Sequence, residues 1–134
     1  MFKKLFFISL FSIATLVALP EGYSVELFVK DIAPYLPFVA EQRINAYREY
    51  PYLYAGKMEE EIAYLEWFSQ LKHSAIVIAF YNDEPVGFIT GTALTAFDAH
   101  FQGSIDLFKN AGLPFDSYYY LSDAIVMPEH RNKS

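Results

Sequence analysis

Apolar and polar residues alternate near the beginning and near the end of this chain. In residues 23–29 the odd positions are apolar and the even positions, apart from Phe28, are polar, which predicts a strand. Residues 118–127 combine tyrosines with β-branched and other apolar residues, a composition that favours another strand. The sequence therefore predicts that a sheet includes both of these stretches.

A hairpin is predicted between these two strands. Residues 74–81 and 85–94 are rich in β-branched and aromatic residues, and the sequence Asn-Asp-Glu-Pro at 82–85 is typical of a turn. Gly87 and Gly91 lie inside the second of these runs. Glycine in a strand interior indicates a bulge or the close approach of other backbone, so we expect one of these at each glycine.

Apolar residues spaced three or four positions apart predict three helices. The first spans about residues 37–49 and ends before Pro51, and the second spans residues 57–72. A third, at residues 97–110, ends before Gly112. The order strand, helix, helix, strand, strand, helix, strand predicts a mixed α/β (α+β) domain with a mainly antiparallel sheet flanked by helices.

Three carboxylates begin the second helix. Glu59, Glu60 and Glu61 fall in its first turns, where negative charge is favoured by the helix dipole. Charge runs of this kind are usually solvated, and we expect the same here rather than a catalytic carboxylate pair.

Tyrosines are concentrated in the connection between the first two helices. Tyr50, Tyr52 and Tyr54 alternate with other residues in this turn-like segment. Ordinary packing over the end of the helix is the simpler interpretation. The alternative is that they form one wall of a pocket for an acceptor molecule.

The first residues differ in character from the rest. Lys3 and Lys4 precede an uncharged run at residues 5–19. A basic start followed by an apolar run of this length is typical of a secretory signal peptide and is short for a membrane span. We expect residues 1–20 to be an export signal or an N-terminal membrane anchor, and residues 23–134 to form a domain.

Composition excludes several classes of function. The chain has 134 residues, 54% of them hydrophobic, with a formal net charge of −6. An acidic chain of this kind is a poor binder of nucleic acid, which requires a basic surface. No cysteine is present, which excludes disulfides, thiolate metal sites and a cysteine nucleophile. His73 and His100 have no partner at ligand spacing, so we expect no metal.

The most specific pattern closes the chain. Residues 118–134 read YYYLSDAIVMPEHRNKS, an apolar strand followed by a polar loop. The loop resembles the start of the acyl-CoA-binding motif of the GNAT superfamily of N-acetyltransferases: Arg or Gln, two residues, Gly, one residue, then Gly or Ala. Arg131 matches the first position, and Ser134 stands where the first Gly is expected. The hairpin at residues 74–94 is similar to the second and third GNAT strands.

This resemblance implies the N-terminal half of a GNAT fold that uses acetyl-CoA as co-substrate. A small-molecule or peptide amine would attack the thioester directly, without a covalent enzyme intermediate. The strand backbone would bind the pantetheine arm and polarise the thioester carbonyl, and the loop would bind the pyrophosphate through backbone N–H groups. The residues implied in cofactor binding are Ala124, Ile125, Val126, Arg131, Asn132, Lys133 and Ser134.

Two residues are candidates for the general base that removes the proton of the amine. Asp123 is the leading candidate because it lies beside the implied cofactor gap, and Tyr120 is the alternative. A spacing of three places them on opposite faces of a regular strand, so we expect only one to point into the site. Asp123 could equally be a structural carboxylate that accepts hydrogen bonds from the backbone.

The resemblance stops within the motif, because the chain ends at Ser134. We therefore expect weak or absent activity of this polypeptide alone. The alternatives are a non-catalytic remnant or an exported partner-binding module. The strand at residues 118–127 would have an exposed edge, which could pair with another copy. The signal-like start suggests export or membrane anchoring, whereas acetyl-CoA dependence suggests the cytoplasm.

Overall fold

The computed structural model describes residues 18–133. Most of the expected signal or anchor segment at residues 1–20, and the expected cofactor residue Ser134, lie outside the described residues. Among the described residues, no helix has the length and apolar character needed to cross a membrane.

Four antiparallel strands form one sheet. They are β1 (Tyr23–Phe28), β2 (Ala75–Tyr81), β3 (Glu84–Ala93) and β4 (Tyr119–Val126), and they are hydrogen-bonded in the order β1-β2-β3-β4. The order of the strands in the sheet is the same as their order in the sequence. The two helices between β1 and β2 return the chain to the sheet, so that β2 pairs with β1. The predicted hairpin is β2–β3, and the predicted mixed α/β class with an antiparallel sheet is confirmed.

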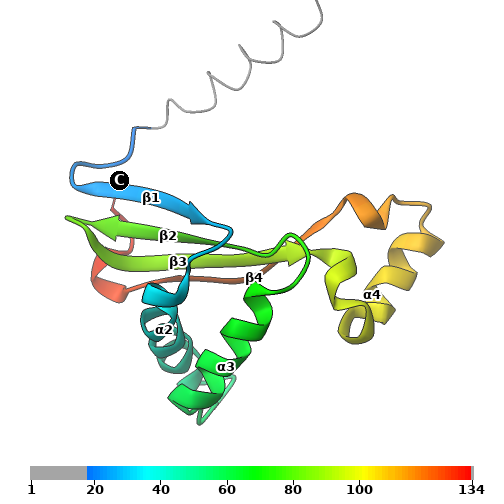
Figure 1. The fold of residues 1–134 in the computed structure, drawn as a ribbon, viewed down its shortest axis with the longest axis horizontal. Helices are drawn as coiled ribbons and strands as arrows, with labels where there is room; N and C mark the ends of the chain where they lie inside the picture. The colour runs from blue at the N-terminus through cyan, green and yellow to red at the C-terminus, as the bar shows by residue number, and fades with distance from the viewer. Residues whose placement is uncertain (1–17, 134) are drawn as a thin grey trace, which may run out of the picture.

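The three predicted helices are also present. They are α2 (Leu36–Arg48), α3 (Met58–Ser69) and α4 (Asp98–Asn110). In Figure 1, α2 and α3 lie together on one side of the sheet, and α4 lies beyond the end of the strands. The sheet therefore has helices on one of its faces only, within the described residues.

The core lies between the sheet and the helix pair α2–α3. Alternate residues of β2 point into it, as the strand period of two requires: Ile76, Ile78 and Phe80 are buried. The helices contribute residues from their apolar stripes. The buried cluster comprises Ile32, Leu36, Val39, Ala40, Leu65, Ile76, Ile78, Phe80 and Phe88.

The opposite face of the sheet is apolar and open to solvent. Leu27 of β1 is 60% exposed and Leu121 of β4 is 63% exposed. Between them, Ile89 of β3 is also exposed, and it is the partner of Val77 and Ala124 in the neighbouring strands. We call this surface the open face; its exposed apolar residues are Val25, Leu27, Ile89, Tyr119, Leu121 and Val126.

Both glycines of β3 lie at irregular points of the sheet, as expected. One register shift lies next to Gly87, and the other lies beside Gly91. A Cβ on Gly87 would lie 2.9 Å from the carbonyl oxygen of Ile125, and one on Gly91 would lie 2.4 Å from the ring of Tyr119. Glycine at these positions allows β4 to approach β3 closely.

The second of these shifts is a bulge in β4. Thr90 is the partner of Asp123, but the next residue of β3, Gly91, is the partner of Leu121. Ser122 is therefore an extra residue in β4, and it changes which side chains face the helices beyond it. This bulge shapes the site described next.

Candidate functional site

A cavity of about 700 Å³ opens between α2, α3 and β4. Four tyrosines and four charged residues contribute to its wall, which is therefore both aromatic and polar. The connection between the two helices supplies part of the same wall. Its lining residues are Arg43, Tyr47, Tyr52, Tyr54, Glu60, Glu61, Tyr64, Ser122 and Asp123. We call this cavity the tyrosine pocket.

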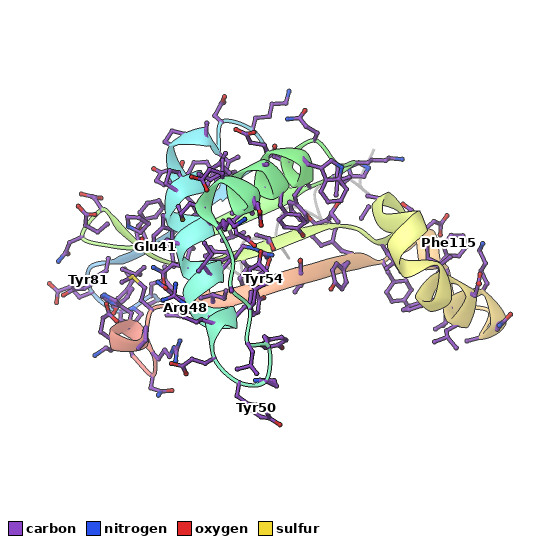
Figure 2. All side chains as sticks on the ribbon, turned by 90° about the horizontal axis from the view of Figure 1, so that it is seen from below. Glu41, Arg48, Tyr50, Tyr54, Tyr81 and Phe115 are labelled. Atoms are coloured by element: carbon purple, nitrogen blue, oxygen red, sulfur yellow. The ribbon has the colours of Figure 1, made fainter. Side chains whose placement is uncertain are left out.

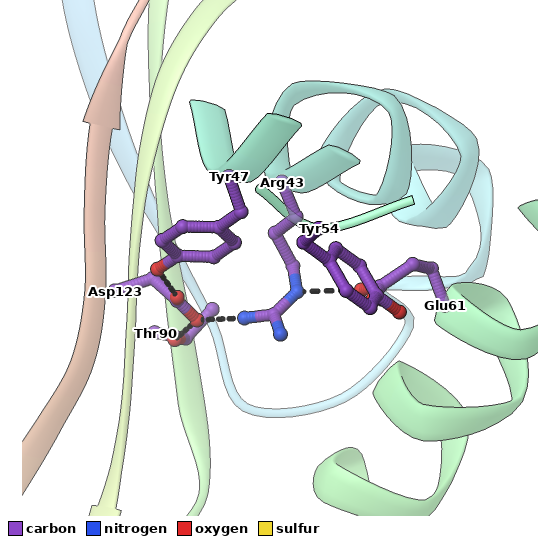
Figure 3. A network of polar contacts seen from close by, with 6 residues as sticks. All are labelled: Arg43, Tyr47, Tyr54, Glu61, Thr90 and Asp123. Atoms are coloured by element: carbon purple, nitrogen blue, oxygen red, sulfur yellow. Dashed lines mark hydrogen bonds and ion pairs between the residues drawn. The ribbon is translucent and has the colours of Figure 1, made fainter. Parts of the chain in front are cut away.

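Arg43 of α2 connects the two sides of the tyrosine pocket (Figure 3). Its Nε donates to Oε2 of Glu61 on α3 at 2.7 Å, and its Nη1 donates to Oδ2 of Asp123 on β4. The guanidinium thus forms ion pairs with two carboxylates from different elements. These pairs fix the positions of α2, α3 and β4 relative to one another.

Asp123 is buried, with 6% of its surface exposed. Besides the Arg43 guanidinium, it accepts hydrogen bonds from the hydroxyl of Tyr47 and from that of Thr90, the latter at 2.7 Å. An ionised carboxylate has about four lone-pair sites, so these three donors leave about one for a ligand. The structural alternative for Asp123 was only partly right: it is a bound carboxylate, but its donors are side chains from α2 and β3 rather than backbone.

Glu61 corrects the expectation that the acidic run of α3 is solvated. Only 4% of its surface is exposed, and it accepts hydrogen bonds from Arg43 and, at 2.8 Å, from the hydroxyl of Tyr54. The reason is its position on the helix. Glu61 precedes Leu65 by four residues, which places it on the stripe that faces the core.

Three tyrosines of the pocket, Tyr47, Tyr54 and Tyr64, have raised pKa values, which favours their protonated form. The pKa of Tyr47 is raised above its ordinary value by burial and by the hydrogen bond to Asp123. The pKa of Tyr54 is raised chiefly by the hydrogen bond to Glu61. Burial raises the pKa of Tyr64, and the neighbouring Arg43 opposes this effect. Tyr47 and Tyr54 are therefore donors to Asp123 and Glu61 at neutral pH.

Tyr120 and Asp123 lie on the same face of β4, so the expectation that they lie on opposite faces was wrong. Tyr120 is the partner of Thr92, and Asp123 is the partner of Thr90. Thr90 and Thr92 are two residues apart on β3 and share a face. The extra residue Ser122 is the reason, because it adds one position between the two candidates.

The tyrosines between α2 and α3 divide into two groups. Tyr52 and Tyr54 line the tyrosine pocket, in agreement with the alternative that they form a pocket wall. Tyr50 is 87% exposed and lies at the outer end of the connecting loop, whereas Tyr54 lies toward β4 (Figure 2). Tyr52 also packs edge-on against Tyr47 in the last turn of α2, with ring centroids 5.0 Å apart, so the simpler interpretation, packing over the helix end, holds for Tyr52.

The residues that the resemblance implies for cofactor binding belong to β4 and to the loop after it. Within the described residues, β4 is an edge strand, with β3 on one side only. The segment that contains Ala124, Ile125 and Val126 forms the second half of this strand. Beyond it, Arg131, Asn132 and Lys133 are exposed, and Nε of Arg131 donates to the carbonyl oxygen of Val126 at 2.8 Å.

His130, in the loop after β4, is partly enclosed. It is half-buried and shares a hydrogen bond of 2.8 Å with the hydroxyl of Tyr23. Its ring also contacts Tyr81. The start of the polar loop is thus fixed against β1 and β2.

No group of three or more histidines, aspartates and glutamates suited to a metal ion exists in the part of the chain that the structure describes. The side chain of His100 lies outside that part. The three carboxylates of the tyrosine pocket are occupied by arginine, lysine and hydroxyl donors.

Arg43, Tyr47 and Glu61 are site residues that the sequence interpretation did not include. Two signals point to them. Arg43 and Tyr47 are four residues apart, so they lie one turn apart on α2, beside buried Ala40 and Ile44. Glu61 falls on the apolar stripe of α3, as described above.

Comparisons with family models, with curated proteins and with solved structures found no match to this chain. The arguments about function therefore rest on its own residues.

Proposed function

We propose that the chain is an N-acyltransferase of the GNAT type, which transfers acetyl from acetyl-CoA to an amine bound in the tyrosine pocket. One observation carries the proposal: β4 has the pocket on its helix-facing side and an unpaired backbone edge within the described residues. A donor bound along that edge would lie next to an acceptor in the pocket. Acyl transfer requires this neighbourhood of the two substrates.

The edge of β4 suits the donor's chemistry. The pantetheine arm of acetyl-CoA carries amide groups, which can form the hydrogen bonds that a neighbouring strand would form. The backbone of Ala124, Ile125 and Val126 would bind it, and one N–H would polarise the thioester carbonyl. The exposed residues Arg131, Asn132 and Lys133 would meet the pyrophosphate.

The reaction in this site is a direct displacement. The neutral amine attacks the carbonyl carbon, a C–N bond forms, the C–S bond breaks, and the CoA thiolate leaves. The amine nitrogen then loses a proton, which Asp123 or Tyr120 accepts directly or through water and which finally neutralises the thiolate. Arg43, Tyr47 and Thr90 are positioning residues, because they hold the Asp123 carboxylate at the floor of the pocket.

A second candidate is a non-catalytic, partner-binding domain. The open face favours it, because contiguous exposed apolar residues on one side of a sheet are typical of interaction surfaces. Pairing of another copy along the edge of β4 belongs to the same candidate. In that case the tyrosine pocket would serve to hold α2 and α3 on the sheet.

Thermal unfolding of the full chain with and without acetyl-CoA tests the proposal. A ligand at 100 times its dissociation constant adds about 2.7 kcal/mol to the free energy of unfolding, so millimolar acetyl-CoA should raise Tm by several degrees. ATP at the same concentration is the control for unspecific anion binding. Release of CoA thiol in the presence of 1,4-diaminobutane reports transfer.

Two proline substitutions test whether acetyl-CoA binds along the edge of β4. Val126→Pro removes a backbone N–H from the strand edge and should abolish the shift, whereas Val25→Pro removes one from β1 at the opposite edge and controls for disruption of an edge strand. Equal Tm with acetyl-CoA, with ATP and without ligand would exclude acetyl-CoA binding and leave the partner-binding candidate.

A further inference from the structure

We infer that the tyrosine pocket selects an alkylammonium cation, with the charged head group against Tyr52, Tyr54 and Glu60. The inference deepens the proposed function and rests on it for the role of the pocket as the acceptor site. It names a charged head group of the acceptor and the residues that bind it, in addition to the neutral nitrogen that attacks the thioester in the proposed reaction.

The charge of the pocket excludes anions. Three carboxylates, Glu60, Glu61 and Asp123, and one guanidinium, Arg43, contribute to its wall, which gives a formal charge of −2. The chain as a whole carries a formal charge of −6. A cation is attracted to such a cavity at long range and gains favourable interactions inside it.

The pocket already stabilises a cation with its aromatic rings. The guanidinium carbon of Arg43 lies 4.7 Å from the ring centroid of Tyr64 and 5.5 Å from that of Tyr47. Positive groups at such distances from tyrosine rings are attracted by the electron-rich ring face. Tyr52 belongs to the same wall and is 66% exposed, so much of its ring surface is open to a second cation.

The inner carboxylates are largely occupied, which directs a ligand to the outer one. Glu61 accepts from Arg43 and Tyr54, and Asp123 accepts from three donors. Glu60 pairs only at the surface with Lys57, at 3.1 Å, and both side chains are mostly exposed. Exposed pairs of this kind are weak, so an ammonium ion can replace Lys57 beside Glu60.

The head group and the chain of the ligand would then have different environments. The ammonium would lie among Glu60, Tyr52 and Tyr54 at the entrance, and its methylene groups would lie against the tyrosine rings inside. In a diamine the second nitrogen would reach toward Asp123. The structure thus favours amines that carry one charge at the pocket entrance.

Titration of the full chain with butylammonium and with 1-pentanol tests the inference. Both probes are unbranched chains; 1-pentanol has one more methylene group than butylammonium and carries no charge, so its greater apolar surface works against the expected preference for the cation. Binding is followed by NMR of protein that carries ¹³C-labelled tyrosine rings, without acyl donor. We expect butylammonium to bind at least about 10-fold more tightly than 1-pentanol, as expected for a cation that gains both charge and ring contacts. Equal affinities, or no binding of butylammonium, would overturn the inference.

Variants with matched controls locate the head group. Tyr52→Leu and Glu60→Gln should each weaken butylammonium binding about 3-fold or more, the scale of one cation–π or charge contact. Tyr50→Leu and Glu59→Gln change the same residue types at positions that do not line the pocket, and should leave it unchanged. Equal effects of the two pairs would place the cation elsewhere and overturn the inference.

The experiment separates this inference from the proposed function. Because no acetyl-CoA is present, a chain that fails to bind the donor can still bind butylammonium, and the inference about the pocket then stands as a cation-binding site. Conversely, a chain that binds acetyl-CoA but does not distinguish butylammonium from 1-pentanol would retain the donor site and lose the inference.

Discussion

The two faces of the sheet are built from the same four strands but have different environments. Toward the helices, Ile78 and Phe88 are buried in a shared cluster, and Thr90 and Asp123 belong to a polar network beside it. On the open face, Leu27 and its neighbours are exposed to solvent. The difference shows that the pattern of apolar residues in a strand does not by itself determine their burial. The helix-facing side is buried because α2 and α3 cover it and supply both apolar contacts and charged partners.

The largest expected effect on the free energy of unfolding comes from the polar network of Arg43, Glu61 and Asp123. In Arg43→Met, Glu61 and Asp123 would remain buried without their shared cation. Removal of one member of a buried ionic cluster costs about 3–5 kcal/mol, and we expect a loss of that size in the free energy of unfolding. Urea denaturation measures it, and Arg48→Met, at an exposed position at the end of the same helix, is the control.

A triple variant separates the charge effect from packing. Arg43→Met combined with Glu61→Gln and Asp123→Asn removes all three charges, and it should recover part of the stability that Arg43→Met loses. If Arg43→Met alone is as stable as the native chain, the network does not hold α2 and α3 on the sheet, and the contrast between the faces rests on apolar contacts alone.

An apolar pair tests the same contrast without charges. Leu65→Ala, in the core of the helix-facing side, should reduce the free energy of unfolding by about 2–5 kcal/mol, because it removes buried methyl groups and leaves a cavity. Leu27→Ala on the open face makes the same chemical change at an exposed position. We expect it to cost about 0.5 kcal/mol or less. Similar losses in the two variants would show that the open face is covered in solution.

Removal of the Tyr47 hydroxyl should have a smaller effect on the free energy of unfolding than loss of Arg43. Tyr47→Phe removes a donor to the buried carboxylate of Asp123 and should cost about 1.5–3 kcal/mol at neutral pH. Tyr50→Phe, at a residue exposed to solvent, should have almost no effect.

Alkaline pH acts on the same side of the sheet. Because the pKa of Tyr47 is raised in the folded chain, the folded state keeps its phenol proton when the unfolded state loses it. The stabilisation is complete below the ordinary phenol pKa of 10.0 and is lost as the pH rises above it. Urea denaturation between pH 9 and 11.5 should show stability falling with pH, with a shallower slope in Tyr47→Phe. An equal slope in that variant would contradict the assignment.

The smallest effect is expected on the open face itself. Leu121→Thr replaces an exposed leucine by a residue that also favours strands, and the free energy of unfolding should change by about 0.5 kcal/mol or less. Size-exclusion chromatography with light scattering should give one mass for both proteins. A larger loss, together with a change from a dimer to a monomer, would show that a second copy covers this face.

Sequence patterns predicted the elements well because each pattern is local. The period of two in β1, the turn between β2 and β3, and the apolar spacing in α2 and α3 were sufficient to place them within a few residues. The site was harder to predict, because its contacts join residues far apart in the chain. The ion pair of Arg43 and Asp123 is an example, because no local sequence pattern around either residue indicates its partner.

The burial of Glu61 and the shared face of Tyr120 and Asp123 have separate physical reasons. The helix dipole favours a carboxylate in the first turn of α3 whether it is solvated or paired, so the charge pattern did not distinguish the two environments. In β4, regular alternation fails at Ser122, and a bulge leaves little trace in a single sequence. Long-range pairing and strand irregularity therefore set the limit of prediction here.

The bulge at Ser122 makes β4 change parity along its length. Before it, the even-numbered Tyr120 faces the helices, and after it the odd-numbered Asp123 and Ile125 do. No substitution at this position restores the alternation, because parity depends on the number of residues and not on their identity. Deletion of Ser122 would remove the extra position, so that Leu121 and Asp123 become successive residues opposite Gly91 and Thr90, and Tyr120 and Asp123 would still share a face. Ser122 thus adds a side chain to the wall of the tyrosine pocket without changing which residues of β4 pair with β3.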